Sequence, residues 1–318
     1  MDNIKLVLGS MTFGPQVSED DSYNLIKEFL ESGYNEIDTA YVYNDGDSEK
    51  ILGSVLEDTT QSSISLATKI HPRITGKLDA NAVYLQFNES LERLKRDSID
   101  VLYFHFPDKN TPIESALNAC NELYQAGKIK ELGLSNFPSW MIVDIWHLCD
   151  KNGWLKPSIY EGRYNALSRN VEKELFPAIR KLKMRFYAYN PLAGGLLTGK
   201  HLSFEEVPEE GRFARLKSYR QRYWKKSFID SINVLSVECR DMDIQPVEAA
   251  FRWLVHHSNL SFSDGDAIIM GASSTLQLRS NMLSVQKDPL PKRIIEAFDE
   301  AWGETKADSP EYFNFYSK

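Results

Sequence analysis

The sequence predicts an α/β fold, a closed (β/α)8 TIM barrel in a single domain over residues 1–318, with a long loop at about 193–227 and a C-terminal tail at about 303–318. Short runs rich in Val, Ile, Leu and Tyr recur eight times, and amphipathic stretches with helical spacing separate most of them. Strand and helix alternate at roughly 30 residues, the length of one βα unit. No G-x-G-x-x-G sequence follows any expected strand, which favours the barrel over an open doubly wound sheet.

Each expected strand is a short apolar or aromatic run bounded by polar or turn residues. Between the strands, spacings such as that of Leu25, Phe29 and Leu30 behind an acidic first turn predict helices. In chain order the eight strand runs are KLVLGSM (5–11), EIDTA (36–40), ISLATKI (64–70), DVLYFHF (100–106), KELGLSN (130–136), SIYEGRYN (158–165), RFYAYNPL (185–192) and AIIMGAS (267–273).

The connection after Pro191 breaks this rhythm, because about 75 residues precede the last strand. It contains the charged run HLSFEEVPEEGRFARLKSYRQRYWKK (201–226). Such a long loop is usually a functional lid or a disordered stretch, and a merely solvated charge run is the alternative. The segment after Trp302 is aromatic, so we expect it to pack back on the barrel. Its aromatic residues are Tyr312, Phe313, Phe315 and Tyr316.

Composition and charge exclude several classes of function. The net charge is −8 and there is no basic stripe, which argues against a nucleic-acid partner or an anionic membrane surface. Cys120, Cys149 and Cys239 lie far apart without CxxC spacing, and the histidines form no ligand set beyond the adjacent His256-His257 pair, so a disulfide framework and a metal site are not expected. No apolar run reaches the length of a signal peptide or a membrane span. We expect a soluble protein of the reducing cytoplasm.

The carboxyl ends of the expected strands are polar in a way that a core does not require. In a barrel of this kind the chemistry belongs at these ends. Taken singly, each has a structural explanation, such as a helix cap, a solvated strand end or a satisfied buried histidine. Taken together, they would converge at the mouth of the barrel. The residues are Asp38, Lys69, His105, Ser135, Asn136, Glu161, Tyr189, Asn190, Ser273 and Ser274.

Four of the residues near the barrel mouth make a proton-transfer set. A Lys69 ammonium would stabilise the phenolate of Tyr43 and so is expected to move the pKa of Tyr43 down toward physiological pH, which suits a general acid. Asp38 would hold the lysine charged and in place. A neutral His105 could donate a hydrogen bond to a carbonyl oxygen and polarise the carbonyl for attack.

With these residues the chain resembles the aldo-keto reductases, whose catalytic tetrad is Asp, Tyr, Lys and His, with Asp and Tyr five positions apart like Asp38 and Tyr43. IDTAYVY, LATK, FHFPD, LGLSNF and NPLAGGLLTGK match in order over almost the whole chain. The last two, with ATKIHP, RYNA, RYW and YF, resemble the aflatoxin aldehyde reductase and succinic semialdehyde reductase branch. The resemblance implies NADPH-dependent reduction of aldehydes (reactive dialdehydes, semialdehydes and aromatic aldehydes) to alcohols, with Tyr43 as proton donor, Lys69, Asp38 and His105 as its partners, and a role in detoxification.

The same resemblance implies a set of cofactor contacts for NADPH bound without a Rossmann fold. Ser135 and Asn136 would bind the nicotinamide carboxamide, and Tyr189 would stack on the ring. Glu161 stands where the family carries Gln, and a carboxylate can accept from an amide but donates to its oxygen only when protonated. The implied cofactor-binding residues are Met11, Asp38, Ser135, Asn136, Glu161, Tyr189, Asn190, Pro191, Leu192, Gly194, Gly195, Lys200, Arg212, Ser273, Gln277 and Asn281.

Phosphate and substrate contacts follow from two further segments. In NPLAGGLLTGK, Gly194, Gly199 and Lys200 imitate the opening of a Walker A motif, but His201 replaces its Ser or Thr and no helix pattern follows, so the resemblance assigns the segment to the cofactor pyrophosphate. Arg212 and Arg279 are candidate cations for the adenosine 2′-phosphate. The long loop implies a substrate site, and an arginine there favours aldehydes that carry a carboxylate. The implied substrate residues are His105, Tyr219, Arg222 and Trp224. Asn314 stands where the branch has another substrate-contacting Arg, which weakens that preference.

Two other classes of function stay open on the sequence. The related potassium-channel β subunits retain the tetrad, so an NADPH-binding regulatory or sensor barrel is the first alternative. A sugar-phosphate isomerase on the same barrel, which needs no nicotinamide, is the second. Assembly as a homodimer is also open, since dimers occur in the branch.

The segment between Asp38 and the next expected helix has its own expectations. Tyr41 is expected to be a packing residue of the loop. A turn over Asn44-Asp45-Gly46 leads into a helix that begins near Ser48.

Overall fold

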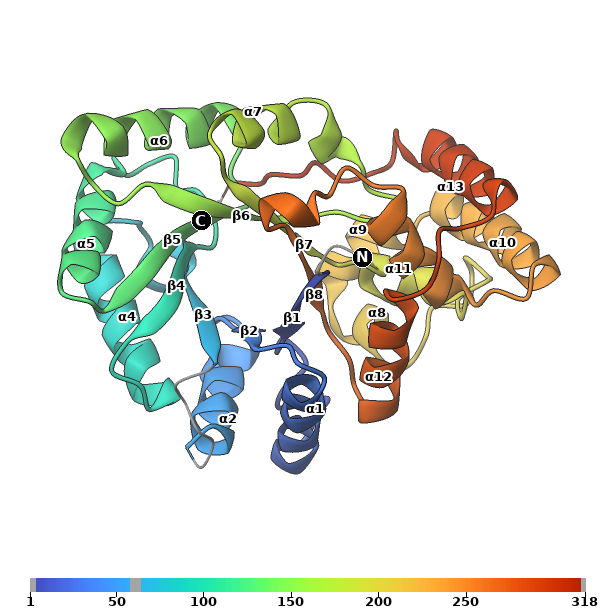
Figure 1. Cartoon of the computed structure of the whole chain (residues 1–318), viewed down its shortest axis with the longest axis horizontal. Coiled ribbons are helices and arrows are strands. Elements are labelled where there is room, and N and C mark those ends of the chain that lie inside the picture. The colour runs from blue at the N-terminus through green and yellow to red at the C-terminus, as the bar shows by residue number, and fades with distance from the viewer. Residues whose placement is uncertain (1–3, 58–63, 316–318) are drawn as a thin grey trace.

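A computed structural model describes residues 4–57 and 64–315 and shows a closed barrel of eight parallel strands with helices around it (Figure 1). Each strand pairs with the next in sequence, and β8 closes the barrel on β1. The expected fold class is therefore confirmed. The strands are β1 (Lys5–Gly9), β2 (Glu36–Asp38), β3 (Ser65–Ile70), β4 (Ile99–Phe104), β5 (Ile129–Ser135), β6 (Pro157–Arg163), β7 (Arg185–Tyr189) and β8 (Ala267–Met270).

All eight strands fall within or beside the runs expected from sequence, and most end one to three residues earlier. The helices between them fold as amphipathic segments, with Leu25 and Phe29 of α1 fully buried. The α-helices are α1 (Glu19–Glu31), α2 (Asp47–Val55), α3 (Pro72–Thr75), α4 (Ala80–Leu94), α5 (Glu114–Gln125), α6 (Ser139–Asn152), α7 (Leu175–Lys181), α8 (Arg212–Arg215), α9 (Lys217–Tyr223), α10 (Lys226–Asp241), α11 (Pro246–His256), α12 (Thr275–Ser284) and α13 (Lys292–Thr305). Short 3-10 turns are η1 (Asn44–Gly46), η3 (Asn170–Glu172), η4 (Ala193–Thr198) and η5 (Phe262–Asp264).

The alternation of side chains along the strands separates two cores. One large apolar cluster lies between the sheet and the helices, and a smaller one fills the barrel with residues such as Val101 and Tyr103. Side chains on a strand alternate between the two faces. Lys69 stands two residues after the interior Ala67, and Glu161 two after the interior Ile159, so both enter the barrel at its carboxyl end.

The long connection after Pro191 differs from the loop expected at about 193–227. It contains η4, α8 and α9, and the helices α10 and α11 then complete the path to β8. Phe213 of α8 and Tyr223 of α9 are buried, which explains why this charged stretch is ordered. Part of the connection is therefore anchored by short helices on the barrel, while residues 200–211 between η4 and α8 are non-helical and mostly exposed.

The aromatic tail packs on the barrel as expected, although helix α13 extends to Thr305 and so shortens it. Tyr312 is buried, and its hydroxyl accepts a hydrogen bond of 3.0 Å from the backbone N–H of Ser139. The ammonium of Lys109 lies 4.6 Å from the ring centroid of Phe315. Tyr316 lies outside the described residues.

Two further observations concern the cysteines and the helices. Cys120, Cys149 and Cys239 are free and buried. Over residues 4–57 and 64–315, no helix is long and apolar enough to cross a membrane.

Candidate active site

A buried lysine is the centre of the site at the carboxyl end of the barrel. The Lys69 side chain has no exposed surface, and its ammonium donates hydrogen bonds to the carboxylate of Asp38 and to the carbonyl oxygen of Thr39, the latter at 3.0 Å. A second carboxylate oxygen, Oε2 of Glu161, lies 3.1 Å from Lys69 Nζ. This oxygen makes no hydrogen bond within the described chain. The predicted convergence of Asp38 and Lys69 is thus present, and Glu161 joins them.

The pKa values of these three groups follow from burial and mutual charge. Burial alone would lower the pKa of Lys69, but Asp38 and Glu161 outweigh it and the pKa is raised. Burial raises the pKa of Asp38 in spite of the neighbouring ammonium. Burial, followed by the charge of Asp38, raises the pKa of Glu161 to about 8. The lysine is therefore held charged, and the carboxylate pair retains a proton near neutral pH.

Tyr43 lies beside this cluster, with Lys69 Nζ 5.5 Å from its ring centroid. The expected lowering of the pKa of Tyr43 is wrong for this structure. Burial first, then the carboxylates of Asp38 and Glu161, raise the pKa of the phenol well above its ordinary value. One ammonium cannot outweigh two carboxylates and desolvation. Tyr43 stays protonated, so it can donate a proton but does not rest as a phenolate.

His105 faces Tyr43 edge to face, with ring centroids 6.0 Å apart. It is buried, and burial together with the neighbouring His71 holds its pKa well below the usual value. Its Nδ1 is buried without a hydrogen-bond partner within the described residues. A neutral imidazole beside the phenol matches the expected role of polarising a carbonyl.

The ends of β5 and β7 form a hydrogen-bonded polar wall. Asn136 has φ of 63°, a left-handed conformation that Asn tolerates. Its Nδ2 donates to the His105 carbonyl and to Ser135 Oγ, both at 2.9 Å, and its Oδ1 accepts from the Tyr189 hydroxyl at 2.8 Å. Three strand ends are thus locked into one geometry.

The glycine-rich segment after β7 bends around the cavity. Gly194 and Gly195 have φ of 72° and 109°, which few other residues adopt. A Cβ at Gly194 would lie 2.7 Å from the ring of Tyr219, so the backbone is packed directly against α9. After Lys200 no helix begins until α8, which agrees with the rejection of a Walker A site.

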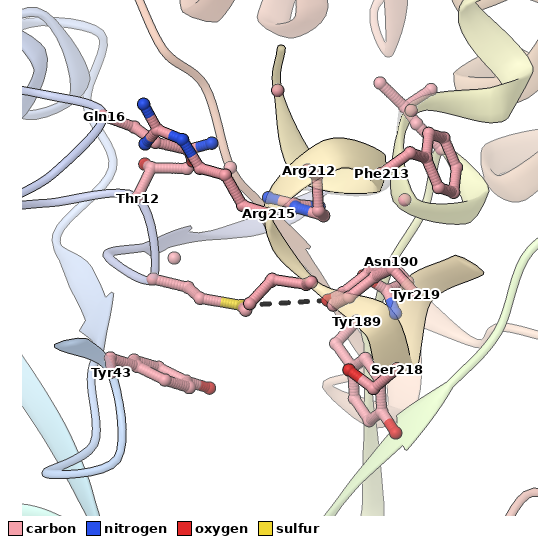
Figure 2. Close-up of a pocket in the computed structure, with 18 of the residues that line it drawn as sticks. Thr12, Gln16, Tyr43, Tyr189, Asn190, Arg212, Phe213, Arg215, Ser218 and Tyr219 are labelled. Atoms are coloured by element: carbon pink, nitrogen blue, oxygen red, sulfur yellow. Dashed lines mark hydrogen bonds between the residues drawn. The ribbon is translucent and has the colours of Figure 1, made fainter. Parts of the chain in front are cut away.

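These elements enclose a cavity of about 1050 Å³. In Figure 2, Tyr43 lies on one side, with Tyr189, Asn190 and Tyr219 on the opposite side. Predicted residues that line the cavity are Met11, Asp38, Tyr43, His105, Ser135, Asn136, Glu161, Tyr189, Asn190, Pro191, Leu192, Gly194, Gly195, Lys200, Arg212, Tyr219, Arg222, Ser273 and Gln277.

A few predicted residues lie elsewhere. Lys69 is buried and is not one of the residues that line the cavity. Asn281 is buried in α12 outside the lining, and Trp224 packs between His201 and Phe213. Arg279 forms hydrogen bonds of 2.8 and 2.5 Å with Glu28 and is not part of the lining.

The cavity also contains residues that sequence reasoning missed. His71 and Arg73 follow β3 directly, and the His71 ring centroid lies 5.2 Å from that of His105. Arg215 of α8 joins Arg212 in the lining, as Figure 2 shows. The position of His71 and Arg73 just after the strand that carries Lys69 was a usable signal, because strand ends define this site.

The amino-acid sequence of the chain is similar to those of known proteins. Residues 5–303 match the model of the aldo/keto reductase family. The chain is 42% identical to aflatoxin B1 aldehyde reductase member 2 of Rattus norvegicus, covering 96% of this chain and 87% of that protein. It is 41% identical to the Homo sapiens protein of the same name, with coverages of 96% and 89%. It is 40% identical to aldo-keto reductase family 7 member A3 of Homo sapiens, covering 96% of each.

Proposed function

The chain belongs to the aldo/keto reductase family, a family of oxidoreductases, and on that premise we propose that it reduces aldehydes to alcohols with NADPH as the hydride source. The observation that carries the proposal is the convergence of Asp38, Lys69, Tyr43 and His105 at the mouth of the barrel, three of them lining a large cavity. Two relatives at about 40% identity are named as aldehyde reductases.

The cavity residues fit a nicotinamide dinucleotide. Asn190 Nδ2 is buried beside the cavity without a hydrogen-bond partner within the described residues, and Glu161 Oε2, which lies 3.1 Å from the Lys69 ammonium, accepts no hydrogen bond that meets ordinary geometry. Tyr189 offers an aromatic face for the ring. Lys200 and Arg212 line the part of the cavity beyond the glycine-rich turn, where phosphates would lie. When bound, a reduced nicotinamide supplies the hydride.

The protein's own contribution is to place and protonate the carbonyl. His105 donates a hydrogen bond to the carbonyl oxygen and draws electron density from its carbon. As the carbon accepts hydride, Tyr43 transfers its hydroxyl proton to the oxygen, so the product is an alcohol and the phenolate regains a proton from solvent. Lys69 stabilises the transient phenolate, and Asp38 fixes the lysine.

The preferred substrate class follows from the cations around the cavity. Arg222 lines it with its guanidinium 5.4 Å from the ring centroid of Tyr219, and Arg73 lines it beside His71. A guanidinium recognises a carboxylate with paired hydrogen bonds. We therefore propose semialdehydes that carry a carboxylate, with reactive dialdehydes and aromatic aldehydes as further substrates, and detoxification as the setting.

The test compares two tyrosines in the same loop. The guanidinium carbon of Arg93 lies 4.5 Å from the ring centroid of Tyr41, and Tyr41 does not line the cavity. With NADPH and 4-nitrobenzaldehyde or succinic semialdehyde, Tyr43→Phe should lower turnover by about 10²–10⁴-fold and leave NADPH binding nearly unchanged. Tyr41→Phe should retain wild-type turnover. Unchanged turnover in Tyr43→Phe would contradict the mechanism, and tight NADPH binding without turnover in wild type would point to a sensor.

A further inference from the structure

The buried cluster around Lys69 has more negative than positive groups. One ammonium lies between two carboxylates, those of Asp38 and Glu161, and none of the three side chains is more than 4% exposed. Two hydrogen bonds of the ammonium are already directed to Asp38 and to the Thr39 carbonyl. Glu161 Oε2 lies 3.1 Å from the same ammonium as an ion pair, and its side chain is part of the cavity wall.

No further cation forms an ion pair with Glu161 within the described residues. Beside it on the neighbouring strands, β5 presents the neutral Ser135 and β7 presents Tyr187. In the part of the chain that the structure describes, its only ion pair is with Lys69. The titratable or charged groups around it on the cavity side and in the barrel interior are Asp38 of β2, Tyr43 after β2, Lys69 of β3, Tyr103 of β4, His105 after β4, Arg163 of its own strand, and Tyr187 and Tyr189 of β7.

Two other basic side chains near the cluster, Arg163 and His105, form no ion pair with Glu161 within the described residues. Arg163 directs Nη1 to the carbonyl oxygen of Glu311 in the tail, at 3.1 Å. His105 stays neutral because burial lowers its pKa. With both carboxylates ionised, the cluster carries one excess negative charge; with Glu161 protonated, it is neutral.

We propose that Glu161 selects the oxidation state of the bound nicotinamide: protonated, it suits the reduced ring, and ionised, it favours the oxidised ring. This inference rests on the proposed function. A reduced nicotinamide ring is neutral and an oxidised one carries a positive charge, so only the oxidised ring gains from an excess negative charge on the cavity wall. The Glu161 side chain is buried, which strengthens the effect.

The pH at which this selection operates follows from the state of Glu161. Burial and Asp38 raise its pKa to about 8, so the carboxyl is mostly protonated below that pH. A positive ring would lower this pKa, because it stabilises the carboxylate. Binding of NADP⁺ should therefore tighten as pH rises toward about 8 and level off above it, while NADPH binding is indifferent to this proton.

The experiment measures the dissociation constants of NADP⁺ and NADPH by fluorescence titration between about pH 6 and about pH 9, and follows their ratio. The 2′-phosphate and the adenosine are common to both, so their titrations cancel. In wild type the ratio should shift by about tenfold, the change that one unit of pKa shift produces. In Glu161→Gln, which keeps the shape without the charge, the ratio should not depend on pH.

A matched control uses another glutamate of the barrel interior. Glu36 begins β2 at the opposite end of the barrel, where its carboxylate pairs with Lys5 at 2.6 Å. Glu36→Gln should keep the wild-type pH dependence. A ratio that stays flat in wild type, or a dependence that persists in Glu161→Gln, would overturn the proposal.

A second measurement needs no variant. Calorimetry in two buffers of different ionisation enthalpy counts the protons released on binding. Near pH 7, wild type should release a fraction of a proton with NADP⁺ beyond what it releases with NADPH, and equal release would refute the role of Glu161. If both cofactors bind and only these pH effects are absent, the proposed function stands and this inference fails. If neither cofactor binds, both fall.

Discussion

Removal of the Lys69 charge tests whether this side chain is the counter-ion of the buried carboxylates. In Lys69→Met the side chain keeps its approximate length, but Asp38 and Glu161 lose their shared cation. Glu161 with a pKa of about 8 is already mostly protonated at pH 7, so most of the cost falls on Asp38. A buried carboxylate without a partner takes up a proton instead of staying ionised.

The cost can be worked from the proton that Asp38 must take up. In the unfolded chain its pKa is about 3.9, so holding it protonated at pH 7 costs about 4 kcal/mol, within the range for breaking a buried pair. Because the folded pKa is raised, stability is retained at low pH and lost as pH rises. Part of this cost is already present in wild type, because burial raises the pKa of Asp38 there. The loss in Lys69→Met should therefore be at most about 4 kcal/mol at pH 7 and at most about 1.5 kcal/mol at pH 5.

Urea unfolding of wild type and variant at the two pH values measures both numbers from the shift in midpoint at constant slope. The double variant Asp38→Asn, Lys69→Met removes the carboxylate as well. It should recover most of the stability lost at pH 7, and its stability relative to wild type should no longer differ between the two pH values. An equal loss at both pH values would refute the charge account and indicate a packing defect.

Two further predictions concern the cofactor loop and the fold. Gly194→Ala should weaken NADPH binding by about tenfold, since its Cβ would displace the Tyr219 ring and its φ is strained, at a cost of about 1–3 kcal/mol. Fluorescence titration checks this. Gly195→Ala has backbone strain of its own, at φ of 109°, but its Cβ meets nothing within 4 Å, so it should leave the Tyr219 ring in place and isolates the effect of the strain. Asp266→Asn should lower the free energy of unfolding by about 3–5 kcal/mol, because the fully buried carboxylate pairs with Arg180; a urea midpoint within experimental error of wild type would contradict it.

The strands could be predicted because each is a short, largely buried apolar run bounded by polar or turn residues. The convergence of strand carboxyl ends at the mouth of a barrel then predicted that Asp38 and Lys69 lie in one region. The helices within 193–227 could not be predicted in the same way, since α8 and α9 are short and their charged sequence hides the few buried anchors such as Phe213.

The pKa of Tyr43 was mispredicted chiefly because the sequence does not show how deeply the phenol is buried, which is the largest cause of the rise, followed by the charges of Asp38 and Glu161. Sequence spacing places Lys69 near the phenol, but it does not reveal that Glu161, from the opposite side of the barrel, lies 3.1 Å from the same ammonium. In a closed barrel, side chains from strands far apart in the sequence lie close together. The pKa of a group at one strand end therefore depends on charged groups at the ends of all eight strands.

The protonation state of Glu161 affects both the acidity of Tyr43 and the binding of the nicotinamide ring, because both respond to the net charge of the buried cluster. When Glu161 is protonated, Lys69 and Asp38 neutralise each other, and Tyr43 faces less negative charge, so it gives up its proton more readily. The same state favours a neutral, reduced ring on the cavity wall. When Glu161 ionises above about pH 8, the phenol becomes a weaker acid and an oxidised ring is held more tightly. Both effects act in the same direction, so a single buried proton should bias the site toward reduction below this pH and toward alcohol oxidation above it.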